Sequence, residues 1–177
     1  MEKSLKSIAS NYGLYLGAIL ALLTVIAYGV NLDLFTKIWF GLSLLALIIV
    51  FGIISISKSK KMQDGFISFK DAFTSYFITI LIGIVISALV SYIVFGFVDT
   101  EAATVIQEKV VESQIQMMEN FGAPEEAIAE TVDKMEAQGN MYAIGNVLQS
   151  LLWQLAGFSV VGLIIAAIMK KNNPDAE

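Results

Sequence analysis

The hydrophobic residues of this chain are collected into four long stretches, residues 7–32, 38–57, 72–98 and 137–169, which contain no charged side chain. About 20 apolar residues form a helix that crosses a hydrocarbon core of about 30 Å, and each stretch reaches that length. We therefore predict an all-α integral membrane protein, a single domain over residues 1–177 with a four-helix bundle. The expected spans are about residues 12–30, 38–57, 72–98 and 145–169.

The polar stretch between the third and fourth spans, residues 99–139, has the pattern of two short amphipathic helices. Apolar residues of the first helix recur at helical spacing: Ala103, Ile106, Val110, Met117 and Phe121. The second helix repeats the pattern with Ile128, Val132 and Met135, and Gly122 and Pro124 separate the two helices. We predict a helical hairpin that lies on or above one membrane face.

This hairpin is strongly acidic, since it holds ten of the sixteen acidic residues and only two lysines, Lys109 and Lys134. Three interpretations are open: a solvated cap that keeps two spans apart, a docking surface for another protein, or a site for a divalent cation. The acids lack the alternating spacing and the glycine of a calcium loop, which disfavours the cation site. The concentrated negative charge also argues against nucleic acid as a partner.

Lysine placement predicts the orientation in the membrane. With the N-terminus in the cytoplasm, the inner segments hold eight lysines: Lys3, Lys6, Lys58, Lys60, Lys61, Lys70, Lys170 and Lys171. The outer segments hold three: Lys37, Lys109 and Lys134. The positive-inside rule therefore favours cytoplasmic termini and an extracytoplasmic hairpin. The first apolar run is long for a signal peptide, so we expect it to be retained as a span.

Small residues recur every four positions in two of the spans. The first span has Gly13, Gly17 and Ala21; the third has Ser75, Thr79, Gly83, Ser87 and Ser91. Small residues at this spacing let two helix backbones approach closely, and hydroxyl groups can bond across the contact. We predict that these stripes are helix-packing faces, within one chain or between subunits. Glycine is also common in membrane helices without any such role.

The fourth span carries polar side chains in its first half: Asn146, Gln149, Ser150 and Gln154. Unpaired amides are costly in hydrocarbon, so these groups need partners. One interpretation is that they bond to a neighbouring helix or lie at the interface. The alternative is that they line a polar path in an oligomer.

Residues that carry chemistry are scarce. The chain has no Cys, His or Arg, and no Asp, Glu or Lys lies within the expected spans. General acid–base catalysis relies most often on His, and ion-coupled transporters usually keep an ionisable group at membrane depth. We therefore expect a protein that is not an enzyme, without catalytic residues, a metal site or a cofactor.

Two segments together resemble one family. The first is Gly65-x-Ile67-Ser68-Phe69-x-x-Ala72-Phe73, where Ser68 and Asp71 also resemble a capping box at the start of the third span. The second is the acidic loop that leads to a last span ending in residues 166–171. The chain resembles the small four-span bacterial membrane proteins of domain-of-unknown-function family 4199, common in Bacteroidetes-type bacteria. The resemblance implies a bacterial inner-membrane location and no particular activity.

We interpret the chain as a non-enzymatic accessory or scaffold protein of the bacterial inner membrane. It would act through helix packing and its acidic hairpin, with membrane lipids and another membrane protein or a second copy as partners. The alternative is a small channel or facilitator formed by an oligomer and lined by the polar residues of the fourth span. An enzyme that uses loop carboxylates such as Glu125 or Asp133 is the weakest hypothesis, because no nucleophile–base pair is visible.

Overall fold

The computed structural model describes residues 4–173, and within that range all regular elements are helical. Four helices are long and apolar enough to cross a membrane, as predicted. They are α1 (Leu5–Val30), α2 (Ile38–Met62), α3 (Phe69–Ile93) with the π-helical turn η2 (Val94–Val98), and α6 (Ile144–Met169). The remaining helices are the 3-10 turn η1 (Leu32–Thr36), α4 (Thr100–Asn120) and α5 (Glu125–Ala137).

Several helix boundaries differ from the expected spans. Helix α1 begins at Leu5, seven residues before the expected start, because Ser4 caps its N-terminus through a bond from the backbone N–H of Ser7. Helix α2 continues five residues past Ser57 through a lysine-rich turn. The predicted cap of the third span is confirmed, since the Ser68 hydroxyl accepts from the backbone N–H of Asp71 at 3.1 Å.

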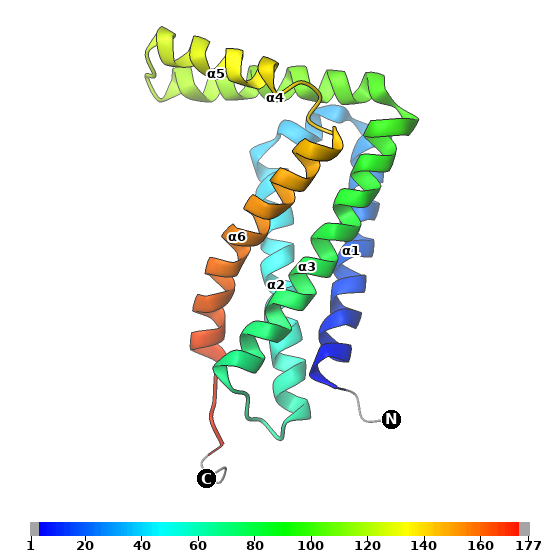
Figure 1. Cartoon of the computed structure of the whole chain (residues 1–177), viewed down its shortest axis with the longest axis vertical. Helices are drawn as coiled ribbons and strands as arrows, with labels where there is room; N and C mark the ends of the chain where they lie inside the picture. The colour runs from blue at the N-terminus through cyan, green and yellow to red at the C-terminus, as the bar shows by residue number, and fades with distance from the viewer. Residues whose placement is uncertain (1–3, 174–177) are drawn as a thin grey trace.

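The four spans form a bundle in which α3 contacts each of the other three. Both ends of the described chain lie at one end of the bundle, which we call the terminal end (Figure 1). Helices α4 and α5 lie across the opposite end, which we call the arm end (Figure 1). We refer to residues 99–139 as the arm. The cytoplasmic location of the termini stays a prediction. It was based on eight lysines of the inner segments, and one of them, Lys3, lies outside the described residues.

Helices α1 and α3 pack closely because glycines face side chains of the other helix. A Cβ atom added to Gly13 would lie 2.8 Å from Ile82 Cβ, and one added to Gly17 would lie 2.7 Å from Ile86 Cβ. In the other direction, Gly83 of α3 accommodates Leu16 of α1. Such contacts let dispersion forces act over a long stretch of backbone, which drives helix association in lipid.

A buried hydroxyl network joins α1, α2 and α3. The hydroxyl of Ser75 lies 2.9 Å from that of Ser55 and 2.8 Å from that of Ser59, and Thr79 Oγ1 lies 2.7 Å from Ser55 Oγ. Thr79 Oγ1 is also 3.0 Å from the backbone oxygen of Ala9 on α1. All four hydroxyl-bearing residues are completely buried. The network satisfies polar groups that would otherwise be costly in an apolar interior.

Tyr76 closes the bundle between α2 and α6. Its ring contacts Gly52 of α2 on one edge, and a Cβ atom added to Gly162 of α6 would lie 2.5 Å from the ring Cδ1. Near the terminal end, Lys60 Nζ donates to the backbone oxygen of Met169 at 2.9 Å, which joins the same two helices. The terminal halves of α2, α3 and α6 are therefore held together.

The arm is attached to the bundle by a second, smaller core. Phe95 of η2 is fully buried against Ala103 and Ile106 of α4 and against the rings of Tyr28 and Tyr142. This cluster fixes the beginning of α4 on the arm end of the spans.

Two polar contacts strengthen the attachment. The hydroxyl of Tyr28 donates to Asp99 Oδ2 at 2.8 Å, while Asp99 Oδ1 accepts from the backbone N–H of Ala102. Lys109 forms an ion pair with Asp33 of η1 at 2.5 Å. The Ala102 N–H and then the Tyr28 hydroxyl hold the pKa of Asp99 below its ordinary value, and the bond from Lys109 lowers the pKa of Asp33.

We expect the attachment of the arm to withstand acidification to about pH 4. Both carboxylates have a lowered pKa in the folded protein, so their contribution is present above the ordinary pKa of about 3.9 and is lost as the pH falls through the lowered values. A spin label on Gln116→Cys, in a chain without other cysteines, would report the mobility of α4. Asp33→Asn should raise this mobility modestly at neutral pH, since exposed ion pairs are weak. Loosening between pH 7 and pH 5 would contradict the expectation.

Candidate functional site

A cleft opens between α2, α3 and α6 toward the arm end. Its volume is about 560 Å³, within the range of about 300–1,000 Å³ that is typical of ligand sites. Helix α2 contributes Gly41, Leu44, Leu45 and Ile48; α3 contributes Ile84, Ser87, Ala88 and Ser91; α6 contributes Val147, Ser150, Leu151, Gln154 and Phe158. Leu20, Met141 and Tyr142 complete the lining. We call this space the α2–α6 cleft.

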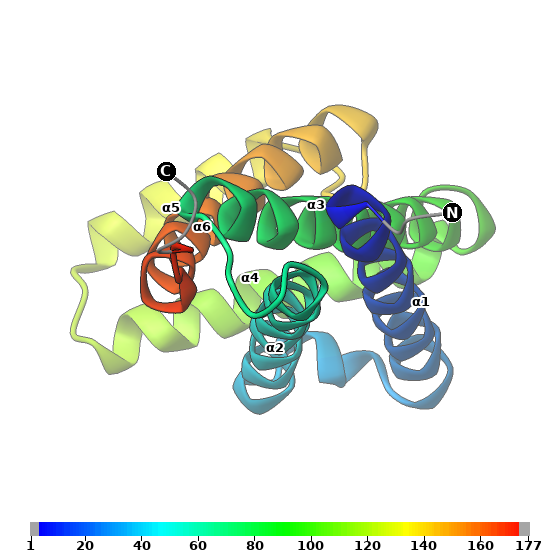
Figure 2. The same ribbon diagram turned by 90° about the horizontal axis from the view of Figure 1, so that it is seen from below.

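The cleft exists because α2 and α6 diverge. They meet around Tyr76 and at the Lys60–Met169 bond, and Figure 2 shows them moving apart toward the arm end. Helix α6 is also the least covered span, with 11% of its most apolar window buried compared with 33% for α1. In the view along the bundle, α4 crosses the gap between α2 and α6 (Figure 2). Ser150 and Gln154, which line the cleft from α6, are exposed, so the cleft is open to the surroundings of the spans.

Four polar side chains of the cleft have no hydrogen-bond partner within residues 4–173. They are Ser87 and Ser91 from α3 and Ser150 and Gln154 from α6. Several hydroxyl groups elsewhere in the spans are satisfied: Thr24 bonds to the backbone oxygen of Leu20, and Ser159 bonds to that of Leu155. The buried hydroxyl of Tyr76, outside the cleft, has no partner within residues 4–173. Unpaired polar groups at membrane depth are costly, and these four side chains leave hydrogen-bonding groups in the cleft that the chain itself does not satisfy.

The small-residue stripe of the third span is divided between two surroundings. Ser75, Thr79 and Gly83 are buried against α1 and α2, whereas Ser87 and Ser91, one and two turns later, line the cleft. In the first span, Gly13 and Gly17 meet α3, and Ala21 is half-buried. The structure thus places these stripe residues at contacts within the chain up to Gly83, and at the cleft beyond it.

The polar residues of the fourth span are also divided. Ser150 and Gln154 line the cleft, but Asn146 bonds through Nδ2 to the backbone oxygens of Gln138 and Asn140 and so fixes the end of the arm. Gln149 is exposed and is not among the residues of the cleft. The sequence spacing grouped these residues on one stretch of helix, but only two of them lie together in the structure.

The cleft carries no charge. None of its lining residues is Asp, Glu or Lys, and burial raises the pKa of Tyr142 to about 12, which keeps this phenol neutral. Within residues 4–173, no group of three or more acidic, His or Cys side chains is arranged to hold a metal ion. The arrangement can therefore offer hydroxyl and amide hydrogen bonds in an apolar setting.

Most of the chain matches the sequence model of one protein family. The family described as "Protein of unknown function (DUF4199)" has a sequence model that matches residues 11–171. The chain belongs to this family. The DUF4199 match includes α1 from residue 11 onward, the other three spans, the arm and every residue of the cleft. No curated protein and no solved structure gives a significant match.

Sequence reasoning missed the residues that shape the cleft of this DUF4199 member. From the sequence, Tyr76 was predicted to lie at the inner headgroup interface with Tyr12 and Phe69, yet its ring is buried between Gly52 and Gly162, where α2 and α6 meet. Gly52 and Gly162 lie on different helices, and their packing against one ring has no local pattern. Gly162 and Ala166 do have the four-residue spacing of small residues, which was a missed signal for a packing face of α6. Tyr142 lines the cleft and also packs in the small core around Phe95. Its contact with Phe95 joins residues far apart in the sequence, so no local pattern predicts it.

Proposed function

We propose that the protein is a non-enzymatic accessory protein of the bacterial inner membrane. In this proposal a transmembrane helix of a partner protein packs in the α2–α6 cleft, with both termini of the chain in the cytoplasm. The single observation that supports it best is the set of four unpartnered polar side chains in one open cleft: Ser87, Ser91, Ser150 and Gln154. Ser and Gln side chains hydrogen-bond between membrane helices, and a partner helix would supply the missing groups.

The packing of the chain supports this location for the partner. The small-residue stripes of α1 and α3 pack against each other, and α6 is the span with the most uncovered surface. Trp153 and Leu152 of α6 are 72% and 69% exposed. A partner helix beside α2 and α6 would contact the cleft without displacing any packed span.

Native mass spectrometry in nanodiscs formed from the protein's own membrane tests the proposal. We expect the wild-type chain to retain a second protein at fixed stoichiometry, and Ser150→Leu with Gln154→Leu to lose it. Gln149→Leu is the matched control, since it removes an amide from the same helix outside the cleft. A lone wild-type monomer, or a cleft variant that keeps the partner, would contradict the proposal.

The same side chains support a second candidate, a small neutral-lined channel formed by several copies. A single chain does not provide a continuous path, because Tyr76 is held between Gly52 and Gly162 beyond the closed end of the cleft. The mass measurement separates the candidates: copies of this chain alone favour the channel. Flux in reconstituted vesicles would then have to change in Ser150→Leu, and unchanged flux would exclude this candidate.

A further inference from the structure

One apolar stripe of α4 runs from a buried into an exposed environment. Ala103 and Ile106 are 1% and 2% exposed in the small core at the arm end, and Val110 packs against the same core. Further along the helix, Met117 is 45% exposed, and Phe121, the residue that follows the helix, is 86% exposed. Met117 follows Ile106 by eleven residues, which is about three helical turns and roughly 16 Å, so both lie on the same side of α4.

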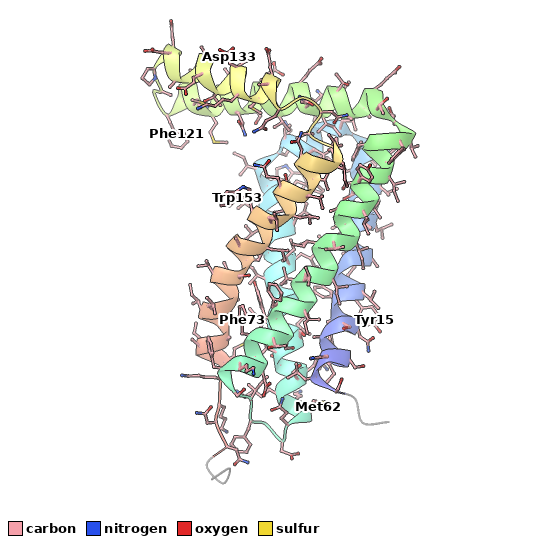
Figure 3. All side chains as sticks on the ribbon, in the orientation of Figure 1. Tyr15, Met62, Phe73, Phe121, Asp133 and Trp153 are labelled. Atoms are coloured by element: carbon pink, nitrogen blue, oxygen red, sulfur yellow. The ribbon has the colours of Figure 1, made fainter. Side chains whose placement is uncertain are left out.

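The exposed part of this stripe overhangs the bundle. Figure 1 shows α4 and α5 extending sideways beyond the arm end of the spans, almost perpendicular to them. In Figure 3, Phe121 points to the bundle side of the arm, the side on which Trp153 of α6 also lies, whereas Asp133 points away. The underside of the overhang therefore faces the layer in which the ends of the spans are embedded.

Both ends of the arm are fixed to the arm end of the bundle. The core around Phe95 and the Lys109–Asp33 ion pair fix the first half of α4. After α5, the Gln107 side chain accepts from the backbone N–H of Met141 and donates to the backbone oxygen of Gly139. Since neither end is free, the overhanging turn between the helices cannot move far from the plane of the arm end.

We propose that the overhanging part of the arm lies in the lipid interface of the leaflet at the arm end, with Met117 and Phe121 inserted at the boundary between headgroups and acyl chains. The partner surface is lipid because Met117 lies on the side of α4 that Ala103 and Ile106 bury at the arm end, where the spans meet that interface. The polar residues Ser113 and Gln114 separate the buried and the exposed parts of this side. Amphipathic helices bind in this position through an apolar face of this kind. The inference is independent of the partner helix in the cleft.

The charge of the arm specifies which lipids suit it. Beyond Lys109 the arm has one further lysine, Lys134, against seven acids: Glu112, Glu119, Glu125, Glu126, Glu130, Asp133 and Glu136. Anionic headgroups would repel this segment, in contrast to the basic helices that bind them. The structure thus fits a leaflet surface with zwitterionic headgroups, above which the acids remain in water.

Depth-dependent quenching by lipids with brominated acyl chains tests this proposal on the full chain. In a background with Trp39→Phe and Trp153→Phe, Phe121→Trp is reconstituted into phosphatidylcholine vesicles, with Asp133→Trp as the matched control on the opposite side of the arm. We expect blue-shifted emission and loss of most fluorescence for Phe121→Trp, and little change for Asp133→Trp. Met117→Trp serves as a second probe and should be quenched as well.

Several outcomes would overturn the proposal. Equal and weak quenching of Phe121→Trp and Asp133→Trp would place the arm in water. Blue-shifted emission of Phe121→Trp without quenching would mean that protein, such as a second copy, covers this surface. Addition of anionic phosphatidylglycerol should reduce the quenching of Phe121→Trp, and an increase would contradict the choice of zwitterionic lipid.

Discussion

Replacing Gly162 by leucine is expected to separate α6 from α3 and destabilise the folded bundle by about 1–3 kcal/mol or more. A Cβ atom at this position would lie 2.5 Å from Tyr76 Cδ1 and 2.6 Å from Cε1. The ring cannot move away, because its other edge already contacts Gly52 of α2. Helix α6 must therefore move, and this movement breaks the packing of α2, α3 and α6 around Tyr76.

Gly157→Leu is the matched control for this prediction. It makes the same substitution on the same helix, and a Cβ atom at Gly157 would meet no atom within 4 Å. Both changes raise helix propensity equally, so the difference between them isolates the contact with Tyr76. Unfolding by titration with a denaturing detergent, followed by circular dichroism, measures the effect. Equal stability of the two variants would show that the Tyr76 contact does not hold α6.

Replacing Thr79 by valine is expected to cost about 1–2 kcal/mol, above the average of about 0.6 kcal/mol for one interhelical hydrogen bond in a membrane. Valine keeps the shape and removes the hydroxyl that lies within bonding distance of Ser55 Oγ and of the Ala9 backbone oxygen. The Thr79 hydroxyl is the donor toward Ser55 Oγ, and its one proton is shared with the backbone oxygens of Ala9 and Ser75. The substitution therefore leaves more than one buried polar group with a lost partner.

Thr24→Val provides the comparison in the same detergent titration. Thr24 bonds only to the backbone oxygen of Leu20 in its own helix and is half-buried, so its loss should change stability little. Ser75→Ala should resemble Thr79→Val, because Ser75 lies between Ser55 and Ser59 in the network. A cost for Thr79→Val no greater than that for Thr24→Val would mean that the network adds no stability.

The number and approximate position of the spans follow from the sequence, because about 20 uncharged residues have few alternatives to a membrane helix. The sequence does not tell which face of each span packs against the other spans. The faces toward lipid and toward protein are both apolar, so hydropathy does not distinguish them. The stripe from Ser75 to Ser91 illustrates the limit. Its spacing predicts close packing, but only the crossing of α1 and α3 separates Gly83, which meets Leu16, from Ser87, which lines the cleft.

The candidate site was only partly predictable for a similar reason. Ser150 and Gln154 were recognised as polar positions that need partners, and they do line the cleft. Asn146 was grouped with them by proximity in sequence, but its amide bonds to backbone oxygens that the arm brings back to α6. Such a contact depends on where a chain of about forty residues returns, and no local pattern encodes it. The orientation predicted from the lysines remains a prediction.

The π-helical turn at Val94–Val98 sets the direction in which α4 leaves the end of α3. A π turn accommodates one residue more than an α-helical turn, and successive helical residues differ in direction by about 100°. Deleting or inserting one residue here would change the direction in which α4 leaves the bundle and would break the contacts of Phe95 and Asp99 that hold the arm, while leaving the contacts of α1 with α3 intact. The side of the bundle that the arm shelters is thus set separately from the packing that makes the bundle fold.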